Sequence, residues 1–476
     1  MYVTQIDSSI NGLTVSNNTN NFIEVKGDLL SEYGRTYDWL DPGIPYRLEG
    51  DLNVYDDDGS QNDEEDATVL KIYPGTTVQF NENKYLQIGG DGNQRGALDA
   101  RGVTFTAVDT SKVWGGINIH DGSINSTVID SNIIEYTNWA FEIWSGATPA
   151  IKNNTIRYNT DYGIYSHGHG RNTRITGNTF LENNSIASFR VMDLDSTLYA
   201  NTYSNNTNNF IVVREARLLE YGRTYDWLDP GIPYRLEGDL NVYDDDGSQN
   251  DEEDATVLKI YPGTTVQFNE NKYLQIGGDG NQRGALDARG VTFTAVDTSK
   301  VWGGINIHDG SINSTVIDSN IIEYTNWAFE IWSGATPAIK NNTIRYNTDY
   351  GIYSHGHGRN TRITGNTFLE NNSIASFRVM DLDSTLYANT YSNNTNNFIV
   401  VREARLLEYG RTYDWLDPGI PYRLDGDLNV YDDDGSQNDE DDATVLKIYP
   451  GTTVQFNENK YLKIGADGNQ RGALDA

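Results

Sequence analysis

Short stretches in which apolar and polar residues alternate recur along the whole chain. "FEIW" at Phe141–Trp144 and "GIYS" at Gly163–Ser166 are examples, and Gly, Asn and Asp punctuate the sequence between such stretches. Alternation of this kind is typical of β-strands with one buried face, and the three-to-four-residue spacing of amphipathic helices is missing. The pattern therefore predicts an all-β fold of many short strands joined by tight turns.

The sequence also repeats over a much longer period. "YGRTYDWLDPGIPYRL" begins at Tyr33, Tyr221 and Tyr409, and Glu32–Leu236 reappears unchanged as Glu220–Leu424, a period of 188 residues. Near-identical tandem copies favour a role in which copy number sets length, because enzymes rarely repeat one catalytic module end to end. The expected division is a diverged partial repeat at 1–32, repeats at 33–220 and 221–408, and a partial repeat at 409–476.

Each copy contains a second, shorter period of 22 to 24 residues, marked by an asparagine at the same place in four similar segments. A unit of this length with three short strands is one coil of a parallel β-helix, whose coils pair about 4.8 Å apart. The shared asparagines would stack at one bend as a hydrogen-bonded ladder. The predicted ladder comprises Asn132, Asn154, Asn178 and Asn201, with Asn320, Asn342, Asn366 and Asn389 in the next copy. A second asparagine follows about five residues later, at Asn138, Asn159, Asn183 and Asn206.

About seven coils fit into each copy, but the segment that joins the copies departs from the alternating pattern. "REARLLEYGRTYDWLDPGI" at Arg214–Ile232 is the one candidate for a helical or irregular insertion. The sequence leaves open whether the β-helix continues through this joint or breaks there.

The first half of each copy carries a set of recurring marks. Pro-Tyr precedes a "GDL-x-V" strand, followed by "L-x-I-x-PG-x-x-V-x-F" and "WGGI", at Pro45–Val54, Leu70–Phe80 and Trp114–Ile117. With these marks the chain resembles secreted bacterial and archaeal right-handed parallel β-helix repeat proteins of the pectate-lyase-like kind, found on cell surfaces. The resemblance implies the fold, whereas the functions of such proteins range from lyases and hydrolases to adhesins and envelope components.

The net charge of −33 narrows the range of partners. Nucleic-acid backbones need a positive footprint, which this chain lacks, and no apolar run has the length of a membrane span. We therefore expect no nucleic acid and no membrane insertion. The expected partners are further copies of the chain, cations, and glycans.

The acidic segment "YDDDGSQNDEEDA" at Tyr55–Ala67 is the best candidate for an ion site. Ca²⁺ takes six to eight oxygen ligands from flexible loops, and so many carboxylates repel one another unless they are neutralised. A solvated acidic loop without an ion is the alternative. The predicted Ca²⁺ ligands are Asp56, Asp58, Asn62, Asp63 and Glu65, then Asp244, Asp246, Asn250, Asp251 and Glu253, then Asp432, Asp434, Asn438, Asp439 and Asp441.

The stretch Tyr158–Gly177 contains fragments of a polysaccharide-cleaving active site. Asn159–Asp161, Gly168–Gly170 and Arg174–Ile175 resemble in part the signature words of polygalacturonase-type glycoside hydrolases, whose chemistry needs two carboxylates. In that family the words lie on successive coils, whereas here they follow one another along a single coil. No residue is therefore predicted to be catalytic, and a lyase or hydrolase is the alternative function.

The histidines of this stretch raise the question of a metal site. His167 and His169 alternate, but a site would need a third ligand, and none is evident. We therefore expect an exposed Gly-His loop. A pectate-lyase mechanism would use clustered aspartates such as Asp193 and Asp195 with an arginine base, but no specific motif supports it.

Two surface features bear on glycans. Tryptophans that recur in every copy could stack on sugars if exposed, or pack in the core and turns if not; they are Trp39, Trp114, Trp139 and Trp144. Asn-x-Ser/Thr sequons make four asparagines candidates for glycosylation, namely Asn125, Asn153, Asn183 and Asn205.

The sequence as a whole predicts an all-β protein, a right-handed parallel β-helix solenoid built from tandem 188-residue repeats. The expected role is structural or adhesive, on the outside of a cell, as a stalk, filament, sheath or surface layer stabilised by Ca²⁺. A carbohydrate-active enzyme and a glycan-binding module are the alternatives.

Overall fold

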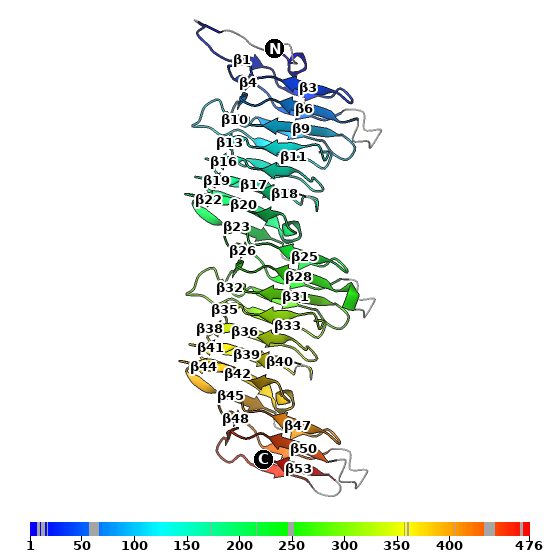
Figure 1. The fold of residues 1–476 in the computed structure, drawn as a ribbon, viewed down its shortest axis with the longest axis vertical. Coiled ribbons are helices and arrows are strands. Elements are labelled where there is room, and N and C mark those ends of the chain that lie inside the picture. The colour runs from blue at the N-terminus through cyan, green and yellow to red at the C-terminus, as the bar shows by residue number, and fades with distance from the viewer. Residues whose placement is uncertain are drawn as a thin grey trace. The chain divides into compact units, whose positions relative to one another are not determined.

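The computed structural model describes two compact units built almost entirely from short parallel β-strands (Figure 1). One unit comprises Met1–Glu215 with Leu228–Tyr234, and the other comprises Ala216–Trp227 with Arg235–Ala476. The residues described are 1–6, 10, 15–16, 18–56, 66–171, 173–215, 217–245, 252–356, 358, 361–403, 405–432, 443–466 and 470–476.

The strands of the first unit form three parallel sheets, here called the first, second and third faces, and successive strands of the chain take the three faces in turn. The first face contains β1 (Ile23–Val25), β4 (Tyr46–Leu48), β7 (Thr77–Phe80), β10 (Thr104–Ala107), β13 (Ile133–Glu135), β16 (Thr155–Arg157), β19 (Thr179–Leu181) and β22 (Thr202–Ser204). The second face contains β2 (Asp28–Leu30), β5 (Leu52–Val54), β8 (Tyr85–Ile88), β11 (Gly116–Ile119), β14 (Phe141–Ile143), β17 (Tyr162–Ser166), β20 (Ser185–Arg190) and β23 (Asn208–Arg214). The third face contains β3 (Thr36–Trp39), β6 (Thr68–Ile72), β9 (Gly96–Arg101), β12 (Val128–Asp130), β15 (Ala150–Lys152), β18 (Arg174–Thr176) and β21 (Leu198–Tyr199).

The second unit repeats this order, and β26 (Tyr234–Leu236) lies at the division between the units. Strands equivalent to the first face are β29 (Thr265–Phe268), β32 (Thr292–Ala295), β35 (Ile321–Glu323), β38 (Thr343–Arg345), β41 (Thr367–Leu369) and β44 (Thr390–Ser392). Strands equivalent to the second face are β24 (Arg217–Leu218), β27 (Leu240–Val242), β30 (Tyr273–Ile276), β33 (Gly304–Ile307), β36 (Trp327–Ile331), β39 (Tyr350–Ser354), β42 (Ser373–Arg378) and β45 (Asn396–Arg402). Strands equivalent to the third face are β25 (Thr224–Trp227), β28 (Thr256–Ile260), β31 (Gly284–Arg289), β34 (Val316–Asp318), β37 (Ala338–Lys340), β40 (Arg362–Thr364) and β43 (Leu386–Tyr387).

Strand β46 and the partial third copy add eight strands to the second unit, and within the described residues a few one-turn 3₁₀ helices lie between strands. The added strands are β46 (Arg405–Leu406), β47 (Thr412–Trp415), β48 (Tyr422–Leu424), β49 (Leu428–Val430), β50 (Thr444–Ile448), β51 (Val454–Phe456), β52 (Leu462–Ile464) and β53 (Gly472–Asp475). The 3₁₀ helices are η1 (Val3–Gln5), η3 (Val191–Leu194), η4 (Glu252–Asp254) and η5 (Val379–Leu382).

Columns of like apolar side chains fill the interior. On the third face Ile129 pairs with Ile151, Ile151 with Ile175, and Ile175 with Leu198, and all four are essentially inaccessible to solvent. Burying each of these side chains stabilises the stack by about 1.5–3 kcal/mol. The all-β fold class and the inward column at every second residue are therefore confirmed.

The coil stack continues through the joint between copies in the second unit. There β45 pairs in parallel with β48, with Ile399 opposite Tyr422 and Val401 opposite Leu424. By its sequence β48 is a first-face strand, yet it extends a sheet of second-face strands, and η5 packs against β46 and β47. The joint in the second unit thus shifts the strands by one face and keeps the parallel pairing.

Candidate functional site

An asparagine ladder follows the third-face strands in both units. Asn154 donates from Nδ2 to the carbonyl of Ile129 at 2.9 Å and to Oδ1 of Asn178 at 3.0 Å, while its own Oδ1 accepts from Asn132. Asn178 continues the chain of bonds to Asn201. The amides of Asn132, Asn154 and Asn178 are buried, so each bond satisfies groups that water cannot reach. The second unit has the corresponding contacts through Asn320, Asn342, Asn366 and Asn389.

A second ladder runs parallel to the first, and its first member differs from the asparagine that the sequence suggests. Asn159 donates to Oδ1 of Asn183 at 2.7 Å, and Asn183 donates to Oδ1 of Asn206 at 3.0 Å. The preceding member is Thr137, which donates to Asn159, whereas Asn138 is exposed. Thr137 thus takes the place of an asparagine in this ladder, and a search for repeated asparagines alone does not find it.

Aromatic rings stack on the outside of the second face. Trp144 lies between His120 and His167, with ring centroids 5.2 and 4.0 Å apart, and Trp139 stacks on Tyr165 at 4.7 Å. Trp144 is 37% exposed, but its neighbours in the stack cover its ring faces. Sugars stack on ring faces rather than edges, so these contacts favour packing between coils. Trp39 and Trp114 are fully buried in the core.

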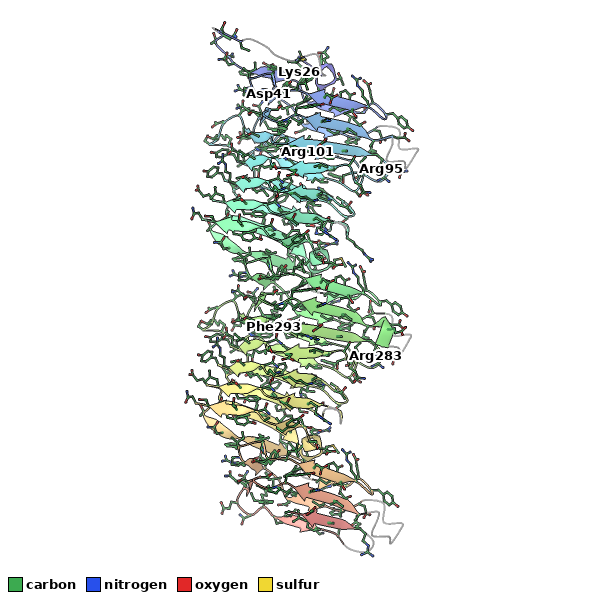
Figure 2. The ribbon with its side chains drawn as sticks, viewed as in Figure 1. Lys26, Asp41, Arg95, Arg101, Arg283 and Phe293 are labelled. Carbon is green, nitrogen blue, oxygen red and sulfur yellow. The ribbon has the colours of Figure 1, made fainter. Side chains whose placement is uncertain are left out.

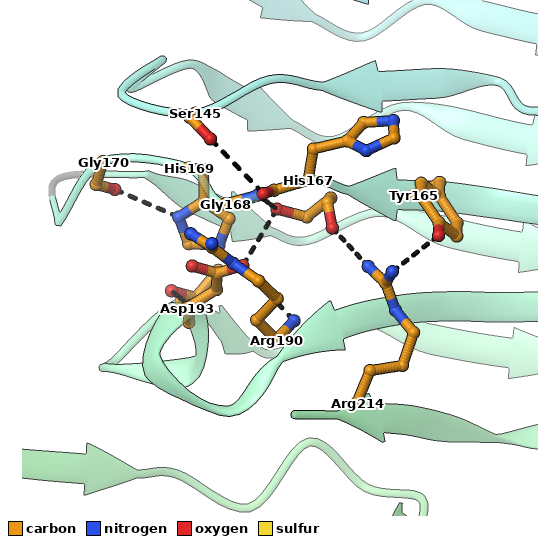
Figure 3. A network of polar contacts seen from close by, with 11 residues as sticks. Ser145, Tyr165, His167, Gly168, His169, Gly170, Arg190, Asp193 and Arg214 are labelled. Atoms are coloured by element: carbon orange, nitrogen blue, oxygen red, sulfur yellow. Dashed lines mark hydrogen bonds and ion pairs between the residues drawn. The ribbon is translucent and has the colours of Figure 1, made fainter. Parts of the chain in front are cut away.

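Two polar pairs lie beside this stack, and Figure 3 shows the one that Arg214 forms. Nε2 of His167 lies 2.8 Å from Oε1 of Glu142, which fixes the orientation of the imidazole. Arg214 donates to the Tyr165 hydroxyl at 2.5 Å and to the carbonyl of Ser166. The second unit has the same arrangement in Glu330 with His355 and in Arg402 with Tyr353. An oriented imidazole beside a phenol and a guanidinium can move a proton or bind a polar ligand.

His169 differs from His167, because it turns inward. Its Nδ1 lies 3.0 Å from the carbonyl of Gly170, its ring meets the edge of Phe189, and its Nε2 is buried. Burial lowers the pKa of His169, so the imidazole is neutral at physiological pH. The expectation of an exposed Gly-His loop is wrong for this residue, because the turn folds back over η3 (Figure 3).

The turn at His169 packs on a buried carboxylate. Oδ2 of Asp193 accepts from Ser166 at 3.2 Å and lies 3.6 Å from the Arg190 guanidinium. Burial raises the pKa of Asp193, and it raises the pKa of the equivalent Asp381 to about 6. Gly168 has a φ of 126°, and a Cβ there would lie 1.6 Å from an Arg190 nitrogen, so only glycine fits.

The residues that resemble polygalacturonase motifs make hydrogen bonds within and between coils of this structure. Asn159 belongs to the second ladder, Oδ2 of Asp161 accepts from the Trp139 indole at 2.9 Å, and Arg174 donates to the carbonyl of Thr173. Asp161 precedes β17 and His169 follows it, so the two lie at opposite ends of one strand. The structure does not bring these words together into one cluster.

The acidic segments lie largely outside the described residues. Asp56, Asp244 and Asp432 are described and buried, and Oδ2 of each accepts a backbone N–H, from Arg95 at 2.7 Å, Arg283 at 2.6 Å and Arg471 (Arg95 and Arg283 are labelled in Figure 2). Glu253 is described and exposed. Asp58, Asn62, Asp63, Glu65, Asp246, Asn250, Asp251, Asp434, Asn438, Asp439 and Asp441 lie outside the described residues. Among the residues that are described, no three acidic or histidine side chains gather as a metal site would require.

The sequons differ in exposure. Asn125, Asn153 and Asn205 are exposed, whereas Asn183 is 2% exposed and donates its amide to Ile156 and Asn206 within the second ladder. A folded chain therefore presents three of the four predicted amides to a modifying enzyme.

These coils, inward columns and ladders define a parallel β-helix protein. The family model described as "Right handed beta helix region" matches residues 67–220 and 256–408, and the chain belongs to this family. The fold expected from the resemblance is therefore confirmed. A search of curated proteins found no match. Within the described part of the chain, no helix has the length and apolar character needed to cross a membrane.

Proposed function

We propose that this protein is an extracellular structural or adhesive element in which the number of copies sets the reach from a cell surface. The observation that carries the proposal is the parallel pairing of β45 with β48, because it lets one copy follow another without ending the coil stack. Solenoids of this kind grow by repetition, each unit resting on its neighbour.

The side chains on the second face support the same proposal. The rings of Trp144, His167 and Tyr165 contact one another, and Glu142 and Arg214 bond to side chains of the same face. Such contacts join neighbouring coils and are repeated in the second unit by Glu330, Trp332, Tyr353, His355 and Arg402. These contacts between coils therefore support a structural role for the side chains on this face.

Electron microscopy of the purified native material tests this role. Fibres, sheets or regular arrays are expected if copies of the chain assemble on a surface. Monodisperse single particles under every salt and Ca²⁺ condition would contradict an assembly role and leave adhesion as the remaining form of the proposal.

A polysaccharide lyase or hydrolase is the second candidate, and the Glu142–His167 pair beside Tyr165 and Arg214 favours it. The test is incubation with polygalacturonate, followed by analysis for shortened or unsaturated products. Products made by the native chain but not by the His167→Ala, His355→Ala double variant would support this enzyme and contradict a purely structural role. Unchanged polymer would count against this substrate.

Ca²⁺ bound by the acidic segments forms part of the proposal. Ca²⁺ would relieve the repulsion among carboxylates that are crowded into Tyr55–Ala67 and its copies. The role of the ion would be to stiffen these segments, with no part in a reaction.

A further inference from the structure

The joint between copies in the second unit contains a pocket of about 560 Å³. It opens where the strands shift by one face, between the end of β42 and the first strands of the next copy. Its volume lies within the range of about 300–1,000 Å³ typical of small-molecule sites. The lining residues are Arg378, Met380, Glu403, Arg405, Leu407, Gly426, Asp427 and Asn429.

Several polar side chains in this pocket have no partner within the protein. In the part of the chain that the structure describes, the side chains of Glu403, Arg405 and Asn429 make no hydrogen bond or ion pair. A neighbouring pocket of about 230 Å³ behaves differently, because there Arg411 bonds to Asp383 at 2.8 Å and Arg378 faces Asp381. In the small pocket the charged side chains are thus bonded to one another. In the large pocket Glu403, Arg405 and Asn429 remain able to bond to a ligand.

The lining of the large pocket selects a neutral ligand rich in hydroxyl groups. Arg378 is already paired with Asp381, so the charges left for a ligand are Arg405 against Glu403 and Asp427, and this excess of carboxylate disfavours an anionic ligand. Guanidinium groups only donate, carboxylates only accept, and the Asn429 amide does both. A hydroxyl group also does both, so neighbouring hydroxyls of a sugar ring can pair with this set. Met380 and Leu407 add apolar surface for the carbon–hydrogen face of such a ring.

We propose that the joint is a binding site for neutral saccharides, with Arg405, Glu403 and Asn429 as its principal contacts. The proposal rests on the adhesive form of the proposed function, since it gives the surface protein a glycan partner.

Isothermal titration of the full chain with neutral hexasaccharides tests the proposal. Cellohexaose, mannohexaose and xylohexaose serve as probes, and hexagalacturonate serves as the acidic comparison. Saturable binding of at least one neutral probe is expected. Binding of hexagalacturonate alone, or of no probe, would overturn the proposal.

The Arg405→Ala variant locates the site. A guanidinium that bonds a ligand contributes enough for its loss to weaken binding at least about tenfold. The matched control is Arg289→Ala, which changes the net charge equally at an outward arginine that is not part of the pocket. Unchanged melting temperatures verify that both variants are folded. Equal affinity in the two variants would overturn the assignment. If the chain binds the probe but its length does not grow with the number of copies, only the spacer role is contradicted.

Discussion

Single buried asparagine side chains hold successive coils together at their bends. An amide in the first ladder, such as that of Asn154, donates to a backbone carbonyl and to the amide oxygen of the next asparagine. It thereby satisfies hydrogen-bonding groups of two neighbouring coils. The repeated asparagine of the sequence is thereby explained by hydrogen bonding alone. The His-Gly-His turn is explained by two roles, since His167 stacks outward on Trp144 and His169 packs inward above Asp193.

Replacing Asn154 with alanine tests the ladder. The change leaves the Ile129 carbonyl and the Asn132 backbone N–H without the Asn154 side chain as their partner in a buried place, and Oδ1 of Asn178 keeps only the Asn154 backbone N–H. Each unsatisfied group costs about 1–3 kcal/mol, so urea unfolding is expected to show a loss of about 3 kcal/mol or more. The control is Asn138→Ala at an exposed position, where the loss should stay below about 0.5 kcal/mol. Equal losses at the two positions would contradict the ladder.

Asp381 gives the stability a definite pH dependence. Its pKa is raised to about 6 by burial, so the protonated form is favoured in the folded state. The stabilisation is complete below the unfolded pKa near 4 and is lost as pH rises through about 6, amounting to at most about 3 kcal/mol.

Urea unfolding at pH 4 and pH 7 measures this effect. The difference in unfolding free energy between the two pH values should shift in Asp381→Asn relative to the native chain, because the amide cannot ionise. Asp287→Asn, at an outward aspartate of the same copy, serves as control and should keep the native pH profile. An unaltered profile in Asp381→Asn would contradict the assignment.

Coils must approach closely where β14 stacks on β11, and the "WGGI" motif provides that approach. Gly116 has a φ of 79°, and a Cβ at this position would lie 1.9 Å from the carbonyl oxygen of Trp139 in the next coil. The motif is therefore a packing requirement between neighbouring coils.

The Gly116→Ala variant should lose more than about 3 kcal/mol of unfolding free energy, since it combines a backbone clash with a left-handed conformation. Gly92→Ala is the matched control, because Gly92 is also left-handed at 64° but a Cβ there meets nothing within 4 Å. A loss of about 1–2 kcal/mol is expected for this control. Similar losses in both variants would show that the close approach is not the cause.

Strand positions and the first ladder could be predicted from the sequence because both depend on local periodicity. Alternation identifies the inward columns, and the repeated asparagine identifies the bend. The role of Thr137 could not be predicted, since its oxygen acts through contact with Asn159 in the next coil. The inward turn of His169 depends on η3 of the following coil, and the shift of face at the joint depends on pairing between distant strands. These features depend on tertiary contacts that leave no periodic signal.

Ca²⁺ removal tests the contribution of the acidic segments to the stability of the molecule. If the ion neutralises Tyr55–Ala67 and its copies, a chelator should lower the melting temperature by several degrees, and added Ca²⁺ should restore it. Mg²⁺ at the same concentration controls for screening by divalent charge in general. An identical melting curve with and without chelator would mean that Ca²⁺ does not stabilise the fold.

We propose that copies extend one coil stack and that their number sets the reach of the protein. Chains with one, two and three complete copies can be compared by small-angle X-ray scattering. Seven coils at a spacing of about 4.8 Å predict that each copy adds about 34 Å to the maximum dimension, with an unchanged cross-section. A maximum dimension that stays constant, or a cross-section that grows with each added copy, would contradict the claim.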